Sequence, residues 1–266
     1  MKKNIRESLA QLLFETYNVP SFCFGEKSTL SLLSTGRNTG IVLHSGNDST
    51  YACPIYEQCP INQSVKISNV SGNEITEYIK ETINFRNFAE DHNKRASEGL
   101  SSSPFMFNTS ADQEIVRDIK EKFSYVALDY DKELLDSQNS TEKYEIYRLP
   151  DQSLLTIQKE RFVCPEILFR PNTYDDVGVD QLVYNSIMSC NRANKQDLFK
   201  NIVLSGGTTM TEGFSDRFTN EITNLAPLNY EVNVIAPKDR NCAAFRGGVV
   251  FTRQPSFKNA NISRDD

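Results

Sequence analysis

Residues 201–222 restrict the folds open to this chain more than any other stretch. Residues 202–204 form a short apolar run with the length and β-branching typical of a buried strand. The turn Ser205-Gly206-Gly207-Thr208 follows, and its two glycines let the backbone pass close to a ligand. Residues 213–225 then predict an amphipathic helix, because large apolar side chains recur at helical spacing: Phe214, Phe218, Ile222 and Leu225.

A strand, a glycine turn and a helix in this order can form a cradle for a nucleotide or another anion. Free backbone N–H groups gather where the turn enters the helix. The same spacing is also found in ordinary turns between a strand and a helix. The residues by themselves therefore leave both interpretations open.

Composition excludes several classes of protein. The chain has 266 residues, enough for a large core in one or two domains. Its net charge of −6 argues against a general nucleic-acid binder and against attachment to anionic lipid by charge alone. The six cysteines include no Cys-x-x-Cys pair, which favours free thiols in a reducing compartment. No apolar run reaches the roughly 18 residues of a membrane span, and the N-terminus lacks a signal-peptide core, so we expect a soluble intracellular protein.

The stretch 201–222 closely resembles the adenosine-binding segment of actin and the actin-related proteins. Residues 31–42 and 113–129 resemble two further segments of that family, and the resemblance runs in order from about Arg6 to about Phe257. It implies an α/β chain with the actin-type ATPase (ribonuclease-H-like) fold, in which the large domain is nearly complete. About a hundred N-terminal residues and the last helix of the family have no counterpart, so most of the small domain is expected to be missing.

The resemblance also implies a division of the chain. Two separate segments should form the large-domain core around one five-stranded mixed sheet. A subdomain should be inserted between them, with an extra exposed polar loop that is longer than in actin. The expected parts are a small-domain remnant at 1–34, the core at 35–70 and 176–242, the inserted subdomain at 71–175 with its loop near 86–107, and a second small-domain remnant at 243–266.

Local patterns predict most of the elements. Apolar spacing and breaker residues predict helices over residues 6–17, 27–35, 114–127, 179–188 and 193–200. Alternation predicts strands over 40–43 and 230–235, and a hairpin made of 144–149 and 153–157.

The turn at residues 44–48 matches the second phosphate hairpin of the family, in which two aspartates organise the water shell of a metal ion. His44 and Asn47 stand at those two positions, and Lys27 and Tyr51 stand where the family has its water-orienting glutamine and its histidine. Phosphoryl transfer depends on positioning and charge stabilisation. These four degenerate positions therefore predict no catalytic residue, no metal and no hydrolysis.

Part of a nucleotide pocket is nevertheless kept. Lys120 and Glu121 match the positions that approach ribose and adenine in the family, although an aromatic has become Thr211 and a lysine has become Asn241. These residues can equally be kept for packing and as solvated surface. No cofactor is expected on balance, with ATP or ADP as the alternative. The candidate nucleotide-binding residues are Lys120, Glu121, Gly206, Gly207, Thr208, Gly46 and Gly72.

Together these features predict a catalytically inactive, actin-like structural subunit of a larger cytoskeletal assembly, with a ciliary one as an option. Other protein subunits would cover the surface that faces the small domain, and no nucleic acid or membrane is expected. Ordinary filament formation is not expected, because residues 172–176 place two carboxylates where actin has an apolar plug. The alternative function is a module that holds ATP or ADP without hydrolysis. A third possible function is an ATPase whose active site is completed by another chain. The expected location is the cytoplasm and cytoskeleton, and the residues leave the nucleus open.

Overall fold

The structure, a computed structural model, describes residues 3–98, 106–139, 144–173, 175–255 and 257–264, with the backbone alone for 90–98 and 258. The helices are α1 (Lys3–Gln11), α2 (Lys27–Leu33), α3 (Gly72–Glu98), α4 (Ser110–Phe123), α5 (Tyr130–Asn139), α6 (Glu160–Val163), α7 (Val179–Met188), α8 (Arg192–Lys200), α9 (Phe214–Leu225), α10 (Ala243–Thr252) and α11 (Phe257–Ala260). The segment η1 (Leu12–Thr16) is a short π-helix, and the short 3-10 helices are η2 (Asn62–Ser64), η3 (Pro165–Leu168), η4 (Gly207–Met210) and η5 (Arg240–Cys242).

The strands are β1 (Ser21–Phe22), β2 (Gly40–Ser45), β3 (Thr50–Tyr56), β4 (Cys59–Pro60), β5 (Lys66–Ser68), β6 (Glu145–Arg148), β7 (Leu154–Ile157), β8 (Ile202–Ser205), β9 (Val234–Ile235) and β10 (Ile262–Ser263). Within the described chain, six of them form one mixed sheet in the order β4–β3–β2–β8–β9, with β5 also paired to β3. The expectation of a mixed sheet is confirmed. The expected count of five was too low, because the short strands β4 and β5 share the outer edge of β3.

The centre of the sheet is made by β2 and β8. β2 runs parallel to β8, with Leu43 opposite Leu204, and antiparallel to β3. All residues of both strands are buried, as is typical of strands covered on both faces. The side chains alternate between two apolar clusters: Ile41 and Leu43 face one, and Val42 faces the other.

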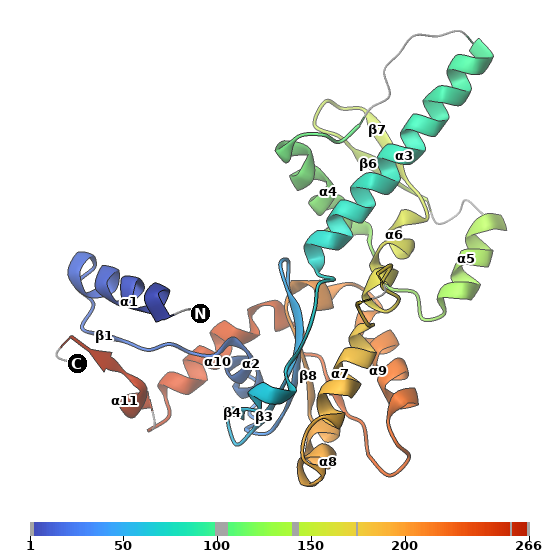
Figure 1. The fold of residues 1–266 in the computed structure, drawn as a ribbon. Coiled ribbons are helices and arrows are strands. Elements are labelled where there is room, and N and C mark those ends of the chain that lie inside the picture. The colour runs from blue at the N-terminus through green and yellow to red at the C-terminus, as the bar shows by residue number, and fades with distance from the viewer. Residues whose placement is uncertain (1–2, 99–105, 140–143, 174, 256, 265–266) are drawn as a thin grey trace.

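Helices cover both faces of this sheet (Figure 1). The larger cluster includes residues of α7, α8 and α9, among them the fully buried Phe199 and Phe218. On the opposite face, Leu32 of α2 packs with Val42 and Val203. The core therefore lies on both sides of β2 and β8, and the ends of these strands are held in place.

The packing of α2 against α10 depends on one glycine. A Cβ on Gly247 would lie 1.6 Å from the carbonyl oxygen of Leu30, whereas a Cβ on the neighbouring Gly248 would meet no atom within 4 Å. The two helices thus approach each other backbone to backbone at Gly247. Figure 1 shows them side by side beneath the chain that connects α2 to β1.

Helix α3 is the main departure from the sequence-based expectation. The polar segment near residues 86–107 is expected to be an exposed loop, but α3 continues to Glu98 and projects away from the sheet (Figure 1). Residues 86–98 contain alanine, glutamate, lysine and arginine, with no glycine or proline before Gly99, and these are strong helix formers. Residues 99–105 of the expected loop lie outside the described part of the chain.

Helix α4 begins earlier than expected, at Ser110 instead of residue 114. Thr109 forms a capping box with Asp112: its hydroxyl accepts a bond from the Asp112 N–H, and the Asp112 carboxylate accepts one from the Thr109 N–H. Such a box satisfies N–H groups that a helix start leaves free. The helix ends at Phe123, so the expected extension to residue 127 was wrong.

Most other expected elements are confirmed within a few residues. The helix expected over 6–17 is α1 followed by η1, and the predicted hairpin is the antiparallel pair β6–β7. Of the strand expected over 230–235, only Val234 and Ile235 pair, with β8. No helix in the described residues combines the length and apolarity needed to cross a membrane.

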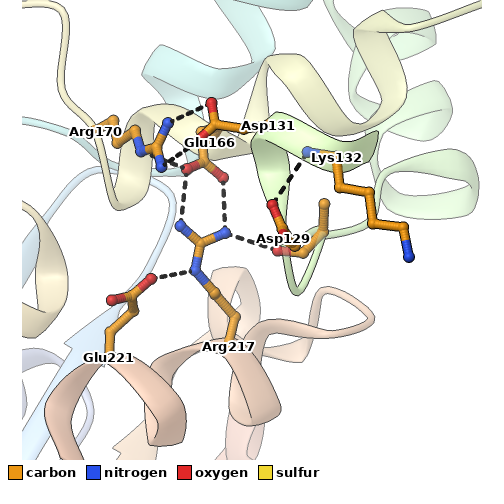
Figure 2. Close-up of polar contacts among 8 residues, drawn as sticks. Asp129, Asp131, Lys132, Glu166, Arg170, Arg217 and Glu221 are labelled. Carbon is orange, nitrogen blue, oxygen red and sulfur yellow. Dashed lines mark hydrogen bonds and ion pairs between the residues drawn. The ribbon is translucent and has the colours of Figure 1, made fainter. Parts of the chain in front are cut away.

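A buried ion cluster joins α9 to the segments around η3 and α5 (Figure 2). The guanidinium of Arg217, whose side chain is 4% exposed, lies 3.0 Å from Glu166 Oε1 and donates to the Ala127 carbonyl oxygen at 2.7 Å. Glu221 accepts from Arg217 Nε at 2.6 Å, and Arg170 lies 3.4 Å from Glu166. Burial raises the pKa of Glu166, and Arg217 opposes that shift. The cluster fixes three segments that are distant in sequence.

Candidate functional site

The glycine turn after β8 is fixed by its backbone. Gly206 has a φ of +98°, and a Cβ there would lie 2.2 Å from the carbonyl oxygen of Ser45. Only glycine suits such a position. The Gly206 N–H donates to the Arg240 carbonyl oxygen at 3.0 Å, and Arg240 Nε donates to Thr209 Oγ1 at 3.0 Å. The turn therefore has a firmly held conformation beside β2.

The hairpin between β2 and β3 lies against this turn. The carbonyl oxygen of Gly46 accepts bonds from Thr208 Oγ1 and from the Gly72 N–H, both at 2.9 Å. A Cβ on Gly72 would lie 2.7 Å from Thr208 Oγ1. The Gly46 N–H donates to Ser49 at 3.0 Å. Gly46, Gly72 and Thr208 thus form a compact corner in which the N–H groups of both glycines are bonded to protein carbonyls.

A pocket of about 510 Å³ opens beside this corner, a size typical of small-molecule sites. Four of the seven predicted nucleotide-binding residues line it: Lys120, Glu121, Gly207 and Thr208. Of the other three, Gly46 and Gly72 belong to the corner with Thr208, and Gly206 lies in the turn that carries Thr208. The rest of the lining is Asn47, Ile75, Lys122, Ser124, Pro165, Met210, Thr211, Glu212 and Asn241.

Lys120 connects the pocket to the start of α3. Its ammonium donates to the Gly72 carbonyl oxygen at 2.7 Å and to Thr76 Oγ1 at 2.8 Å. Burial lowers the pKa of Lys120. An ammonium has three N–H donors, so these two bonds leave one for a ligand. Glu121, by contrast, is exposed and pairs with Arg117 at 3.3 Å. Its carboxylate therefore lies in solvent at the rim of the pocket.

Lys27 and His44, two of the four degenerate catalytic positions, are in direct contact. Lys27 Nζ lies 2.9 Å from His44 Nε2. Because an ammonium can only donate, Nε2 is the acceptor and the proton of the ring lies on Nδ1. That nitrogen lies 3.4 Å from Ser205 Oγ, which is itself 3.1 Å from Ser31 Oγ. A short polar chain therefore runs from the exposed Lys27 into the buried ends of β2 and β8.

His44 is held in the neutral form by its surroundings. Burial, together with the charge of Lys27, lowers its pKa to about 4. Tyr51, the third degenerate position, packs its ring against His44 with centroids 5.1 Å apart. Burial raises the pKa of Tyr51, so its phenol stays protonated. This group offers a lysine cation, a neutral imidazole and a neutral phenol, and it contains no carboxylate.

Asn47, the fourth degenerate position, lies at the tip of the hairpin and faces the pocket. Its carbonyl oxygen accepts bonds from Ser71 Oγ at 2.5 Å and from the Asn73 N–H at 2.8 Å. Its side-chain amide donates to the exposed carboxylate of Asp48 at 2.5 Å. The structure thus brings Lys27, His44 and Tyr51 together and places Asn47 separately, in the lining of the pocket.

Comparison with known proteins agrees with this geometry. The sequence model of the Actin family matches residues 1–266. The chain belongs to the actin family. It is 38% identical over 270 residues to a protein named "Putative actin-29" from Dictyostelium discoideum, a match that covers 99% of this chain and 66% of that relative. The chain therefore spans slightly less than two thirds of the length of this actin.

The metal position of the actin family does not suit a divalent cation in this chain. A hard cation such as Mg²⁺ is held by carboxylate and water oxygens, whereas His44 and Asn47 supply none, and His44 Nε2 already accepts from Lys27. Within the described ranges, no group of three or more His, Cys, Asp or Glu side chains is placed to hold a metal ion.

The resemblance to actins identified the residues of the pocket but missed several that position them. Arg240 and Thr76 were not singled out and Ser205 was named only as the start of the turn, although each bonds directly to a predicted residue or to the turn that carries it. Nothing local in the sequence marks these residues, because each acts across the fold. The sequence does contain one local signal that helps to position the pocket. Thr109 and Asp112 form the capping box at the start of α4, and α4 carries Lys120.

Proposed function

We propose that this chain is an actin-family subunit that does not hydrolyse ATP and that acts through protein contacts in a cytoskeletal assembly. The observation that carries the proposal is the contact between Lys27 and His44. These residues stand where the family places its water-orienting glutamine and its first metal-organising aspartate. A lysine cation bonded to a neutral imidazole can neither accept a proton from water nor hold a metal ion.

Loss of hydrolysis follows from the chemistry of phosphoryl transfer. The protein contributes positioning and charge stabilisation, and the metal ion neutralises the developing charge. In this chain the phenol of Tyr51 stands in the position of the family histidine. With a raised pKa, it is a poor proton acceptor at neutral pH. None of the four degenerate positions keeps the function of its actin counterpart.

A partner surface is the second part of the proposal. Helix α10 presents Phe245, Val249 and Val250 to solvent, with exposed fractions of 78%, 42% and 39%. Phe245 and Val249 are four residues apart and so share a face of the helix. Exposed apolar patches mark interfaces. We infer that another polypeptide covers this face, which lies on the side of the sheet that the small domain covers in actins.

Ordinary filament formation is not part of the proposed role. The segment that matches the apolar plug of actin ends at Asp176, whose carboxylate is bonded to the body of the protein. It accepts from the Asn69 N–H at 3.0 Å and from Thr173 Oγ1 at 2.8 Å. Removing this charged group from water in a contact between filament strands would be costly. A ciliary assembly is one setting for the subunit.

Two measurements test this function. Phosphate release from ATP in the presence of Mg²⁺ should not exceed that of buffer, and metal-dependent release would refute the loss of hydrolysis.

Purification from native cells, followed by mass spectrometry, should recover a defined set of protein partners. Phe245→Ser should lose these partners, and Leu228→Ser, at a fully exposed loop residue, should keep them. Recovery of the Phe245→Ser protein with all its partners would contradict the interface.

A second function is favoured by the pocket itself. The pocket of about 510 Å³ joins Lys120, Glu121, Gly207 and Thr208, which supports a module that holds ATP or ADP without hydrolysis. The nucleotide content of a denatured extract tests this alternative. Gly207→Leu should abolish binding without loss of stability, because a Cβ on Gly207 meets no atom within 4 Å and points into open space. Unchanged nucleotide binding by this variant would place any bound nucleotide elsewhere.

A further inference from the structure

We propose that the Lys27 ammonium is the built-in counter-charge for the phosphates of a nucleoside diphosphate or triphosphate, so that this chain binds nucleotide without a divalent metal ion. The proposal rests on the second function above, retention of nucleotide in the pocket. The proposal changes what nucleotide binding requires. In actins a metal ion would neutralise the phosphates, whereas in this chain the Lys27 side chain would supply the positive charge.

The position of Lys27 is set by His44, which stands at the base of the hairpin beside the pocket, while Lys27 itself lines a neighbouring hollow with Arg6 and Glu26. His44 Nε2 accepts from Lys27 Nζ at 2.9 Å and lies 2.9 Å from the point where a Cβ on Gly46 would stand. The carbonyl oxygen of Gly46 accepts the Thr208 hydroxyl at 2.9 Å, and Thr208 lines the pocket. The ammonium thus lies at the base of the hairpin whose tip faces the pocket.

The Lys27 ammonium also has N–H donors that can bind phosphate oxygens. Of its three N–H groups, His44 takes one, and the Lys27 side chain is exposed. A lysine presents a compact charge that binds phosphate oxygens. The imidazole that holds it is neutral, so the pair carries a single positive charge where the family has a glutamine and a carboxylate that helps to hold the metal ion.

A divalent cation and Lys27 would compete for the same phosphate oxygens. Because like charges repel at short range, a bound Mg²⁺ would raise the free energy of the lysine cation beside it. Nearby, Asp48 adds a carboxylate, but this group is exposed and accepts from Asn47. We therefore expect free ADP and ATP to bind at least as tightly as their magnesium complexes.

Isothermal titration of the full chain with ADP, in EDTA and in Mg²⁺, tests the proposal. The variant Lys27→Gln removes the charge, and its amide can still donate to His44 Nε2. Lys132→Gln is the matched control: it makes the same charge change on α5, where the side chain extends away from its neighbours (Figure 2). We expect binding in EDTA that weakens about tenfold or more in Lys27→Gln and stays unchanged in Lys132→Gln.

The possible outcomes separate the two levels of the proposal. Binding that requires Mg²⁺, or an affinity in EDTA that is equal in Lys27→Gln and the unaltered chain, overturns the role of Lys27 while nucleotide retention stands. No binding in either buffer overturns nucleotide retention and with it the role of Lys27. Circular dichroism of each variant verifies folding, and Lys132→Gln measures any effect of net charge alone.

Discussion

Lys27 donates to Nε2 of His44 across 2.9 Å, and the resemblance to actins predicts a glutamine and an aspartate at these two positions. The imidazole that accepts this hydrogen bond is neutral at physiological pH, since its pKa lies at about 4. The contact therefore fixes both the charge and the tautomer of the ring. Its consequences can be measured independently of any ligand.

The first prediction concerns the protonation of His44. The chain has two histidines, so a His92→Gln variant leaves a single imidazole to follow by NMR. Its titration should give a pKa of about 4. In the Lys27→Gln variant, we expect a higher pKa, because the neighbouring positive charge is gone. A midpoint near the ordinary value of 6.5 in the unaltered chain would contradict the buried contact.

The same group makes stability depend on pH. A histidine whose pKa is lowered on folding binds protons more tightly when unfolded, so its contribution to stability is complete above pH 6.5 and is lost as the pH falls towards 4. The full change amounts to about 3 kcal/mol. Urea unfolding at pH 7 and pH 5 measures the loss, which should shrink in His44→Gln. Equal pH dependence in both proteins would refute this assignment.

A second prediction restores the residues of the family. Lys27→Gln, His44→Asp and Asn47→Asp together return two carboxylates to the hairpin and remove the competing cation. Since carboxylates organise the shell of a hard divalent ion, Mg²⁺ should then tighten ADP binding by about tenfold, or 1.4 kcal/mol. Titration in Mg²⁺ and in EDTA measures the ratio. Carboxylate variants that bind ADP equally in both buffers would show that more of the metal site has been lost.

The third prediction uses two adjacent glycines of α10. Gly247→Ala should lower the free energy of unfolding by about 1–3 kcal/mol, because its Cβ would lie 1.6 Å from the Leu30 carbonyl oxygen and force α2 and α10 apart. Gly248→Ala meets no atom and should raise stability by up to about 1 kcal/mol through helix propensity. Thermal or urea unfolding compares the two. Similar values would mean that the helices are not in backbone contact.

The fourth prediction concerns the buried ion cluster of Figure 2. Arg217→Ala leaves the carboxylate of Glu166, which is 4% exposed, without its main partner and should cost about 3–5 kcal/mol. Replacing both partners, by Arg217→Met with Glu166→Leu, should restore most of that loss. Arg117→Ala, at an exposed pair on α4, is the control and should cost less than about 1 kcal/mol. A double variant no more stable than Arg217→Ala would refute the pairing.

Local patterns were sufficient for the elements around the glycine turn. The apolar run of β8 and the spacing of Phe214, Phe218 and Ile222 predicted a buried strand and helix α9, because burial repeats with the period of each element. The resemblance to actins then placed Lys120 and Thr208 in one pocket. These successes rest on signals contained within about twenty residues or on a long family motif.

Contacts between distant segments could not be read in this way. The sequence identified Lys27 and His44 as departures from the family, but the bond between them depends on how α2 packs on β2. The pairing of Arg217 with Glu166 spans 51 residues and has no periodic signal. The continuation of α3 to Glu98 has a different cause, since a polar segment resembles an exposed loop in composition even where its residues have high helix propensity.

The parallel pairing of β2 with β8 has a consequence for how the chain folds. Val42 pairs with Val203, so the middle of the sheet cannot close until roughly 160 further residues have been synthesised, which takes about 8–30 s at typical rates. During that time β2 has one unpaired, strongly apolar edge, a template for aggregation. Contacts of such long range also slow folding. A nascent chain of this kind is a natural client for chaperones, and its yield in a foreign host should depend on them more than its final stability would indicate.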